Sequence, residues 1–139
     1  MNVLIDHNIS PHIAHALAAM ALPHGHRVEA ITEKFNPATS DAEWLGVLGR
    51  EGGWAFISND QRIWRNPQEC AAMLAAQVIG FFLEPAWRKR NITVFEQAGR
   101  LIMWWPKLMQ QCDIVRPPAA FRVPINPGSR LRSVPLPKR

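Results

Sequence analysis

Val3-Leu4-Ile5-Asp6-His7-Asn8, a short apolar run that ends on an acid, is the stretch that decides the fold. A second run of the same kind, Trp54-Ala55-Phe56-Ile57-Ser58-Asn59-Asp60, lies in the middle of the chain. Apolar runs of this length predict strands that are covered on both faces of a parallel sheet. The carboxyl ends of parallel strands meet at one edge, where open α/β folds keep their active sites. We therefore expect Asp6 and Asp60 to emerge at the same edge.

The segments around these two runs alternate between helical and extended patterns. Helical patterns occupy four segments: 11–21, 40–52, 66–77 and 93 onward. Extended patterns occupy the two apolar runs and three further segments: 26–31, 78–83 and 121–125. Pro106 is expected to kink or restart the last helix, and Pro124 restricts the last strand to an edge of the sheet. The alternation predicts an open, parallel α/β sheet flanked by helices.

Length and composition limit the class of protein. A chain of 139 residues that is 47% hydrophobic is expected to fold as one domain. No run approaches the roughly 20 apolar residues that cross a bilayer, so we expect a cytoplasmic protein with no membrane partner. Cys70 and Cys112 are too few and too far apart for a disulfide scaffold or a zinc knuckle.

The net charge of +5 is a property of the C-terminal segment. Residues 1–113 contain all 11 acids and 10 of the 16 Lys and Arg residues. Residues 114–139 contain the other 6 basic residues and 6 of the 12 prolines. We expect a domain over residues 1–125 and a basic, proline-rich tail over 126–139 that is extended or disordered. Such a tail either attracts a polyanion or only aids solubility, and both interpretations remain open.

Four acids follow or face the carboxyl ends of the predicted strands: Asp6, Asp41, Glu43 and Asp60. Two carboxylates about 4 Å apart repel by roughly 4 kcal/mol at an effective dielectric constant near 20, so such a cluster either takes up protons or binds a cation. Oxygen ligands without cysteine favour Mg²⁺ or Mn²⁺.

Some of these acids also have a structural explanation. Glu43 completes a capping box with Ser40, and Asp41 would be favoured by the helix dipole in the first turn of the same helix. Asp60 could close an Asx turn. Asp6 has no such duty, because Ser10 already caps the helix that follows it.

The order of these motifs resembles that of PIN-domain nucleases. Ile5-Asp6-His7-Asn8 resembles their opening Asp-x-Asn motif, and Asp41-Ala42-Glu43-Trp44 is similar to Asp-x-Glu-Trp. Ser58-Asn59-Asp60-Gln61-Arg62-Ile63, followed by Asn66-Pro67, is similar to their later motif. The match is to the small PIN-like domains grouped with VapC-type toxins, and it covers about residues 2–110.

The resemblance implies a three-layer PIN-like fold with a central, mostly parallel sheet of four to five strands flanked by helices. It implies a metal-dependent endoribonuclease in which Asp6, Asp60 and either Asp41 or Glu43 bind Mg²⁺ or Mn²⁺. Asp6, Asp41 and Asp60 would be catalytic. The same motifs contain two further site residues: Asn8 and Ser58. The family usually has a fourth acid shortly after the third, whereas this chain offers only Asn66, or Glu69 on the helix beyond it.

The resemblance also implies partners. The expected function is that of the toxin of a type II toxin–antitoxin pair, with RNA and a cognate antitoxin protein as partners, and a homodimer is a further expectation. The RNA backbone would lie against five basic residues: Arg62, Arg65, Arg88, Lys89 and Arg90. Trp64 and Trp87 lie among these residues and would either stack on bases or anchor their loops.

Two other interpretations compete with this function. All five histidines lie within residues 1–26, but no third ligand has the spacing of a zinc enzyme, so we interpret them as solvated side chains. The second alternative is a catalytically inactive PIN-like module that binds RNA or a partner protein.

Overall fold

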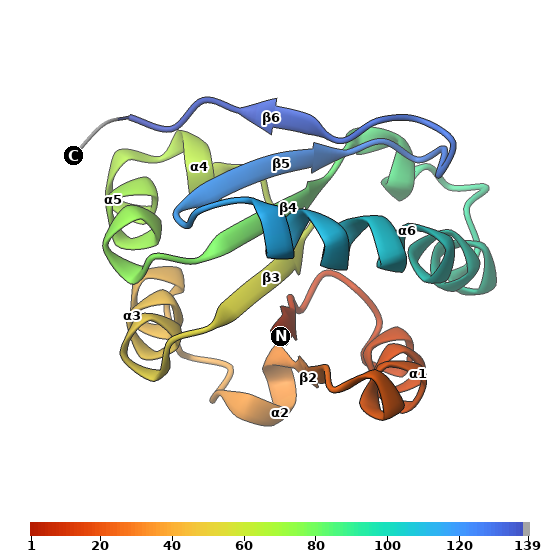
Figure 1. Ribbon diagram of the computed structural model, residues 1–139, viewed down its shortest axis with the longest axis horizontal. Helices are drawn as coiled ribbons and strands as arrows, with labels where there is room; N and C mark the ends of the chain where they lie inside the picture. Colours follow the sequence, from red (N-terminus) through yellow and green to blue (C-terminus); the bar gives the residue numbers. More distant parts are fainter. Residues whose placement is uncertain (138–139) are drawn as a thin grey trace.

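A six-stranded sheet in the order β2-β1-β3-β4-β5-β6 forms the centre of the computed structural model, which describes residues 1–137 (Figure 1). Its strands are β1 (Asn2–Ile5), β2 (Arg27–Ala30), β3 (Trp54–Ser58), β4 (Ile79–Leu83), β5 (Ala119–Val123) and β6 (Arg132–Val134). Neighbouring strands from β2 to β5 pair in parallel, and β6 pairs antiparallel with β5. The predicted α/β fold with a mostly parallel sheet is therefore confirmed.

Six α-helices connect or flank these strands within residues 1–137. They are α1 (Pro11–Ala21), α2 (Ile31–Lys34), α3 (Asp41–Glu51), α4 (Arg62–Arg65), α5 (Pro67–Ala76) and α6 (Val94–Ile114). Short 3₁₀ turns cover Leu22–His24 and Pro85–Arg88. Helices α1 and α6 cover one face of the sheet, and α3 and α5 cover the other (Figure 1). The arrangement has the three layers that were expected.

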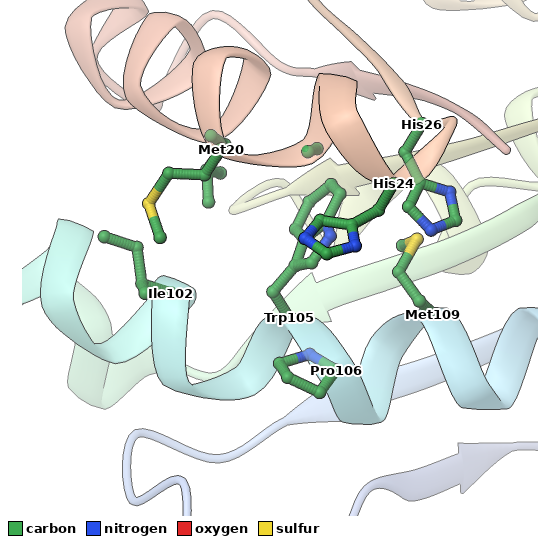
Figure 2. Close-up of a pocket in the computed structure, with 9 residues that line it drawn as sticks. Met20, His24, His26, Ile102, Trp105, Pro106 and Met109 are labelled. Carbon is green, nitrogen blue, oxygen red and sulfur yellow. The ribbon is translucent and has the colours of Figure 1, made fainter.

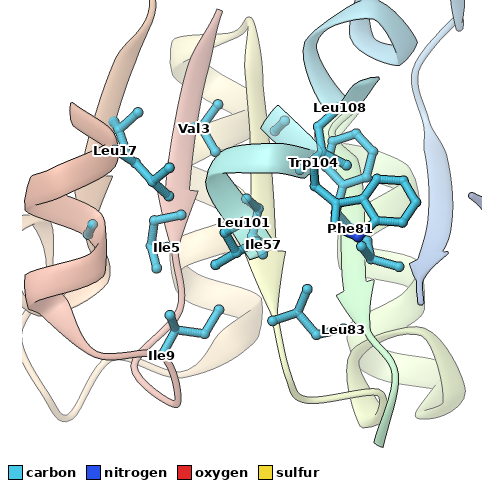
Figure 3. Close-up of a cluster of buried hydrophobic side chains, with 14 of the residues drawn as sticks. Val3, Ile5, Ile9, Leu17, Ile57, Phe81, Leu83, Leu101, Trp104 and Leu108 are labelled. Atoms are coloured by element: carbon cyan, nitrogen blue, oxygen red, sulfur yellow. The ribbon is translucent and has the colours of Figure 1, made fainter. Parts of the chain in front are cut away.

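Strand β1 contributes side chains to two apolar cores, one on each face of the sheet. Val3 and Ile5 point to the core under α1 and α6, which Figure 3 shows, whereas Leu4 belongs to the core under α3 and α5. Successive side chains of a strand point to opposite faces, so a continuous apolar run buries both. All three side chains are at most 1% exposed.

Polar caps fix where four of the helices begin. The cap residues of α1, α3, α5 and α6 each accept a hydrogen bond from a backbone N–H of the first turn; they are Ser10, Ser40, Asn66 and Thr93. Helix α3 ends at Gly52, whose φ of 77° is a left-handed conformation that favours glycine. These starts and this end agree with the sequence pattern.

The structure differs from the predicted elements in three places. The sheet has one strand more than expected, because Arg132–Val134 in the expected tail pairs with β5. Strand β5 is therefore not at the edge, and Pro124 lies just beyond its end. Helix α6 continues through Pro106 without a restart. Trp104 and Leu108, on either side of that proline, are both buried in one core, which keeps the helix in place.

Residues 138 and 139, at the end of the expected tail, lie outside the described residues. None of the helices in the described part of the chain has the length and apolar character needed to span a membrane.

Candidate functional site

The acids that follow β1 and β3 are joined by one hydroxyl group. Asp6 is 1% exposed and Asp60 is 8% exposed, at the carboxyl ends of two paired strands. The Oγ of Ser58 donates to Oδ2 of Asp6 at 2.6 Å and accepts the backbone N–H of Asp60 at 2.9 Å. The two acids therefore lie at the same edge of the sheet, as neighbours in one hydrogen-bonded chain.

Both carboxylate oxygens of Asp6 are engaged. Oδ1 accepts the backbone N–H of His7 at 2.7 Å and lies 2.8 Å from Nδ1 of the same residue. Oδ2 accepts the hydroxyl of Ser58. Burial of a charge is costly unless its oxygens are satisfied, so these bonds explain how an acid can remain here.

Asp60 is held by Arg62 through both of its oxygens. Oδ1 accepts the backbone N–H and Nε of Arg62, each at 3.0 Å, and Oδ2 accepts Nη2 at 2.9 Å. These bonds lower the pKa of Asp60 below its usual value, against the opposing effect of burial. The side chain of Arg62 is itself 82% exposed. A solvated cation therefore covers a nearly buried acid.

Glu69 lies in the first turn of α5. The sequence offered it only as an alternative to Asn66 in place of the family's fourth acid. Burial, and then the charges of Asp41 and Asp60, raise the pKa of Glu69. Within residues 1–137, its buried Oε2 has no hydrogen-bond partner. Asp60 first, and then Glu69 and Asp41, raise the pKa of Arg62. Asp60 thus contacts the guanidinium of Arg62, and the charges of two further acids act on it.

The two acids at the start of α3 have different surroundings. Oδ1 of Asp41 accepts the indole Nε1–H of Trp44 at 2.9 Å, and Asp41 is half-buried. Glu43 is exposed, and its Oε1 accepts the hydroxyl of Ser40 at 3.0 Å while the Ser40 Oγ accepts the backbone N–H of Glu43 at 3.2 Å. This reciprocal pair is the predicted capping box. The geometry favours Asp41 over Glu43 as the acid of the site.

The predicted RNA-binding residues border the same edge. The guanidinium of Arg65 lies over the ring of Trp64, 4.8 Å from its centroid. Nη1 of Arg88 donates to the backbone oxygen of Asn59 at 3.0 Å, and Nδ2 of Asn59 donates to the backbone oxygen of Asn8 at 3.2 Å. These contacts join the loops after β1, β3 and β4. Lys89 and Arg90 are exposed beside Arg88.

Trp87 lies in the core. It is fully buried, and its Nε1 donates to the backbone oxygen of Val123 at 2.9 Å. Base stacking by Trp87, one of the two open interpretations, is therefore wrong, and the residue anchors its loop. Trp64 is half-buried, and its ring and the guanidinium of Arg65 form one aromatic–cation surface. Base stacking by Trp64 stays a prediction.

The acids match a divalent cation in donor type. They offer hard oxygen ligands, which Mg²⁺ and Mn²⁺ prefer, and the unpartnered Oε2 of Glu69 is a spare donor. Across the described residues, however, no three His, Cys, Asp or Glu side chains lie close enough to hold an ion. Arg62 occupies both oxygens of Asp60. An ion that binds these acids would therefore compete with Arg62 for the oxygens of Asp60.

Two cavities differ in their chemistry. One of about 170 Å³ adjoins the acids and is lined in part by His7, Phe35 and Asp41. A larger one, of about 350 Å³, lies between α1 and α6 (Figure 2). Its walls are mostly apolar and include Met20 and Trp105. The larger cavity has no acid in its lining, whereas the smaller one includes Asp41.

Ser58→Ala is expected to lower the free energy of unfolding by about 1–3 kcal/mol, because it removes a donor from the buried carboxylate of Asp6 and an acceptor from the Asp60 amide. Urea unfolding followed by circular dichroism measures the change. The control is Ser133→Ala, at an exposed position in β6, where a change within about 0.5 kcal/mol is expected. Equal, small changes in both variants would contradict a structural role for Ser58.

Comparison with known proteins gives one match. A family model described as "PIN like domain" matches residues 1–85, the part of the chain that contains β1 to β4 and all of the acids discussed above. Neither the curated proteins nor the solved structures include a match.

Proposed function

The chain belongs to the PIN-like domain family, whose model matches residues 1–85 of its 139, and on this basis we propose that it is a metal-dependent endoribonuclease. It uses Mg²⁺ or Mn²⁺ to hydrolyse a phosphodiester bond of RNA. It acts in the cytoplasm as the toxin of a type II toxin–antitoxin pair, so its partners are RNA and a cognate antitoxin protein. A homodimer is retained as a prediction.

One observation carries the proposal: carboxylates from separate segments gather at the carboxyl edge of the sheet. Asp6 and Asp60 follow β1 and β3 and are linked through Ser58. Asp41 begins α3 and Glu69 lies in the first turn of α5, and both act electrostatically on Arg62 beside Asp60. A stable fold has no need for such repulsion, so the gathering favours a catalytic role.

Each group of residues would have a separate role in the reaction. Asp41, Asp60 and Glu69 would hold the cation, with Asp6 completing the set from the buried side. A cation held in this way lowers the pKa of a bound water and stabilises the charge that develops on the phosphodiester. The Arg65–Trp64 surface would position the RNA through a phosphate and a stacked base, and the exposed basic run from Arg88 to Arg90 would bind the backbone.

Incubation of the purified protein with structured RNAs tests the activity. Cleavage is expected in Mn²⁺, and EDTA is expected to abolish it because the carboxylates alone cannot activate water. Asp6→Asn keeps a hydrogen-bonding side chain of the same shape but removes the charge. It is expected to reduce the cleavage rate about tenfold or more. Equal cleavage in EDTA and in Mn²⁺ would contradict the metal-dependent mechanism.

The same pair of proteins tests the toxin role in cells. Conditional expression of the wild-type chain in a bacterium is expected to arrest growth, and expression of Asp6→Asn is not. Cleavage of RNA in vitro without growth arrest would contradict the toxin role alone and leave the nuclease in place.

The contact between Arg62 and Asp60 favours one second candidate, a catalytically inactive PIN-like module that binds RNA or a partner protein. This candidate predicts RNA binding that persists in EDTA, weakens with salt and does not depend on the acids.

A further inference from the structure

Arg62 is the cation that the acidic site contains. Its guanidinium donates to both oxygens of Asp60, and its backbone N–H donates to one of them. The charges of Glu69 and Asp41 also act on it. A mostly exposed arginine gains little from a single surface contact, so three bonds to one acid in an acidic surrounding mark a specific arrangement.

The hydrogen bonds from Arg62 occupy the carboxylate oxygens of Asp60 that a metal ion would need as ligands. A carboxylate offers about four lone-pair positions on two oxygens, and Arg62 uses three of those on Asp60. A divalent ion at the same oxygens would also lie next to a fixed positive charge, and like charges repel strongly at such short range. The two cations therefore compete for Asp60.

We propose that Arg62 is an internal counter-ion of the acidic site, which competes with the divalent cation for Asp60 and exchanges this acid for a backbone phosphate when RNA binds. This inference rests on the proposed function. A phosphate can replace the carboxylate because both present two oxygens to the planar fork of a guanidinium. Once Arg62 has moved to the phosphate, Asp60 is free to bind the ion.

The exchange makes the ion and the RNA bind cooperatively. Thermodynamic linkage requires that if RNA raises the affinity for the ion, the ion raises the affinity for RNA by the same factor. Without RNA, the charges of Glu69 and Asp41 act on the guanidinium of Arg62. The free protein thus keeps its acids neutralised and its ion affinity low, and it becomes competent only on its substrate.

Arg65 provides the matched control for the Mn²⁺ measurement, because it lies on the same four-residue helix, α4, and carries the same charge. Its Nη2 donates to Oε1 of Gln61 at 3.4 Å, and its guanidinium lies over Trp64. Arg65→Gln therefore removes one positive charge beside the site without altering the bonds to Asp60.

The test measures two affinities of the full-length protein. Mn²⁺ binding is measured by electron paramagnetic resonance titration without RNA, and RNA binding is measured in EDTA. Arg62→Gln is expected to raise the Mn²⁺ affinity about tenfold, within the usual 5–150-fold range of coupling. It is expected to weaken RNA binding and to reduce the salt slope by about 1. The double variant Asp60→Asn/Arg62→Gln is expected to lose the gain in Mn²⁺ affinity.

Each other outcome has one meaning. Unchanged Mn²⁺ affinity in Arg62→Gln, with clear binding by the wild type, would overturn the counter-ion and leave the proposed nuclease intact. An equal gain in Arg65→Gln would assign the effect to net charge and would also overturn it. A gain in Mn²⁺ affinity without weaker RNA binding would overturn the exchange. Failure of both the wild type and Arg62→Gln to bind Mn²⁺ would overturn the inference together with the metal-dependent function.

Discussion

Glu69→Gln is expected to reduce RNA cleavage in Mn²⁺ by about 100-fold or more, while the protein remains folded. The substitution keeps the shape of the side chain and removes only its charge. Because Glu69 acts on Asp41, Asp60 and Arg62 from the first turn of α5, we expect it to be a direct ligand of the ion. Loss of a ligand exceeds the roughly 10–100-fold loss that is typical of a residue that merely orients one. Single-turnover cleavage at saturating RNA measures the effect.

Glu96→Gln is a closely matched control. Glu96 and Glu69 each lie three residues after the cap of a helix, behind Thr93 and Asn66 respectively. The helix-dipole contribution of the two carboxylates is therefore similar. The contact of the Glu96 side chain is different: its Oε2 accepts a hydrogen bond from Nε of Arg100 at 3.3 Å. We expect unchanged cleavage in Glu96→Gln. An equal loss in both variants would show that the effect comes from removing a negative charge in the first turn of a helix, and not from the site.

Stability distinguishes a functional acid from a structural one. Burial and the neighbouring acids raise the pKa of Glu69, which means that the folded protein disfavours its charged form. A neutral glutamine is therefore expected to leave the free energy of unfolding unchanged or higher. A clear decrease in stability would mean that the loss of cleavage reflects damage to the fold.

Most of the fold could be predicted because its determinants are local. The caps Ser10, Ser40 and Thr93 and the stop at Gly52 follow from residues within one helical turn. The edge strand β6 could not be predicted, because a short, basic, proline-rich segment has no strong pattern of its own. Its pairing with β5, and the burial of Val134 against the core under α3 and α5, depend on tertiary contacts.

The candidate site was predictable in part, for a similar reason. Asp6 and Asp60 each follow an apolar run, so the sheet topology alone places them at one edge. Glu69 has the sequence signature of an ordinary first-turn acid behind a capping Asn66. The charge of Asp60 acts on Glu69 across α4, the helix that connects them, and the sequence of that segment indicated only a polar turn. The Asx turn predicted at Asp60 accounts for the bond from the backbone N–H of Arg62, but nothing local predicts that the guanidinium binds Asp60 and not RNA.

Gly80 lies at a tightly packed point of the core under α3 and α5. It lies in β4, paired with Phe56 of β3 on one side and with Ala120 of β5 on the other. A Cβ atom at this position would lie 2.8 Å from Cζ of Phe56 and 2.9 Å from both Cε of Met73 and Cε2 of Phe82. The rings of Phe56 and Phe82 meet edge to face, with centroids 5.5 Å apart. The glycine thus makes room for an aromatic pair.

Gly80→Val is expected to lower the free energy of unfolding by about 3 kcal/mol or more, at the upper end of the cost of overpacking a core. The aromatic neighbours are fully buried and cannot move into solvent, so the added atoms must displace the strand or break the ring pair.

Gly99→Ala is the control for adding a side chain to a glycine. No atom lies within 4 Å of a Cβ built there, and Gly99 is an exposed position in α6, so a gain of about 0.5–1 kcal/mol is expected. Urea unfolding of both variants gives the two changes, and a change of less than about 1 kcal/mol in Gly80→Val would mean that β4 is not packed against Phe56 and Phe82 as described.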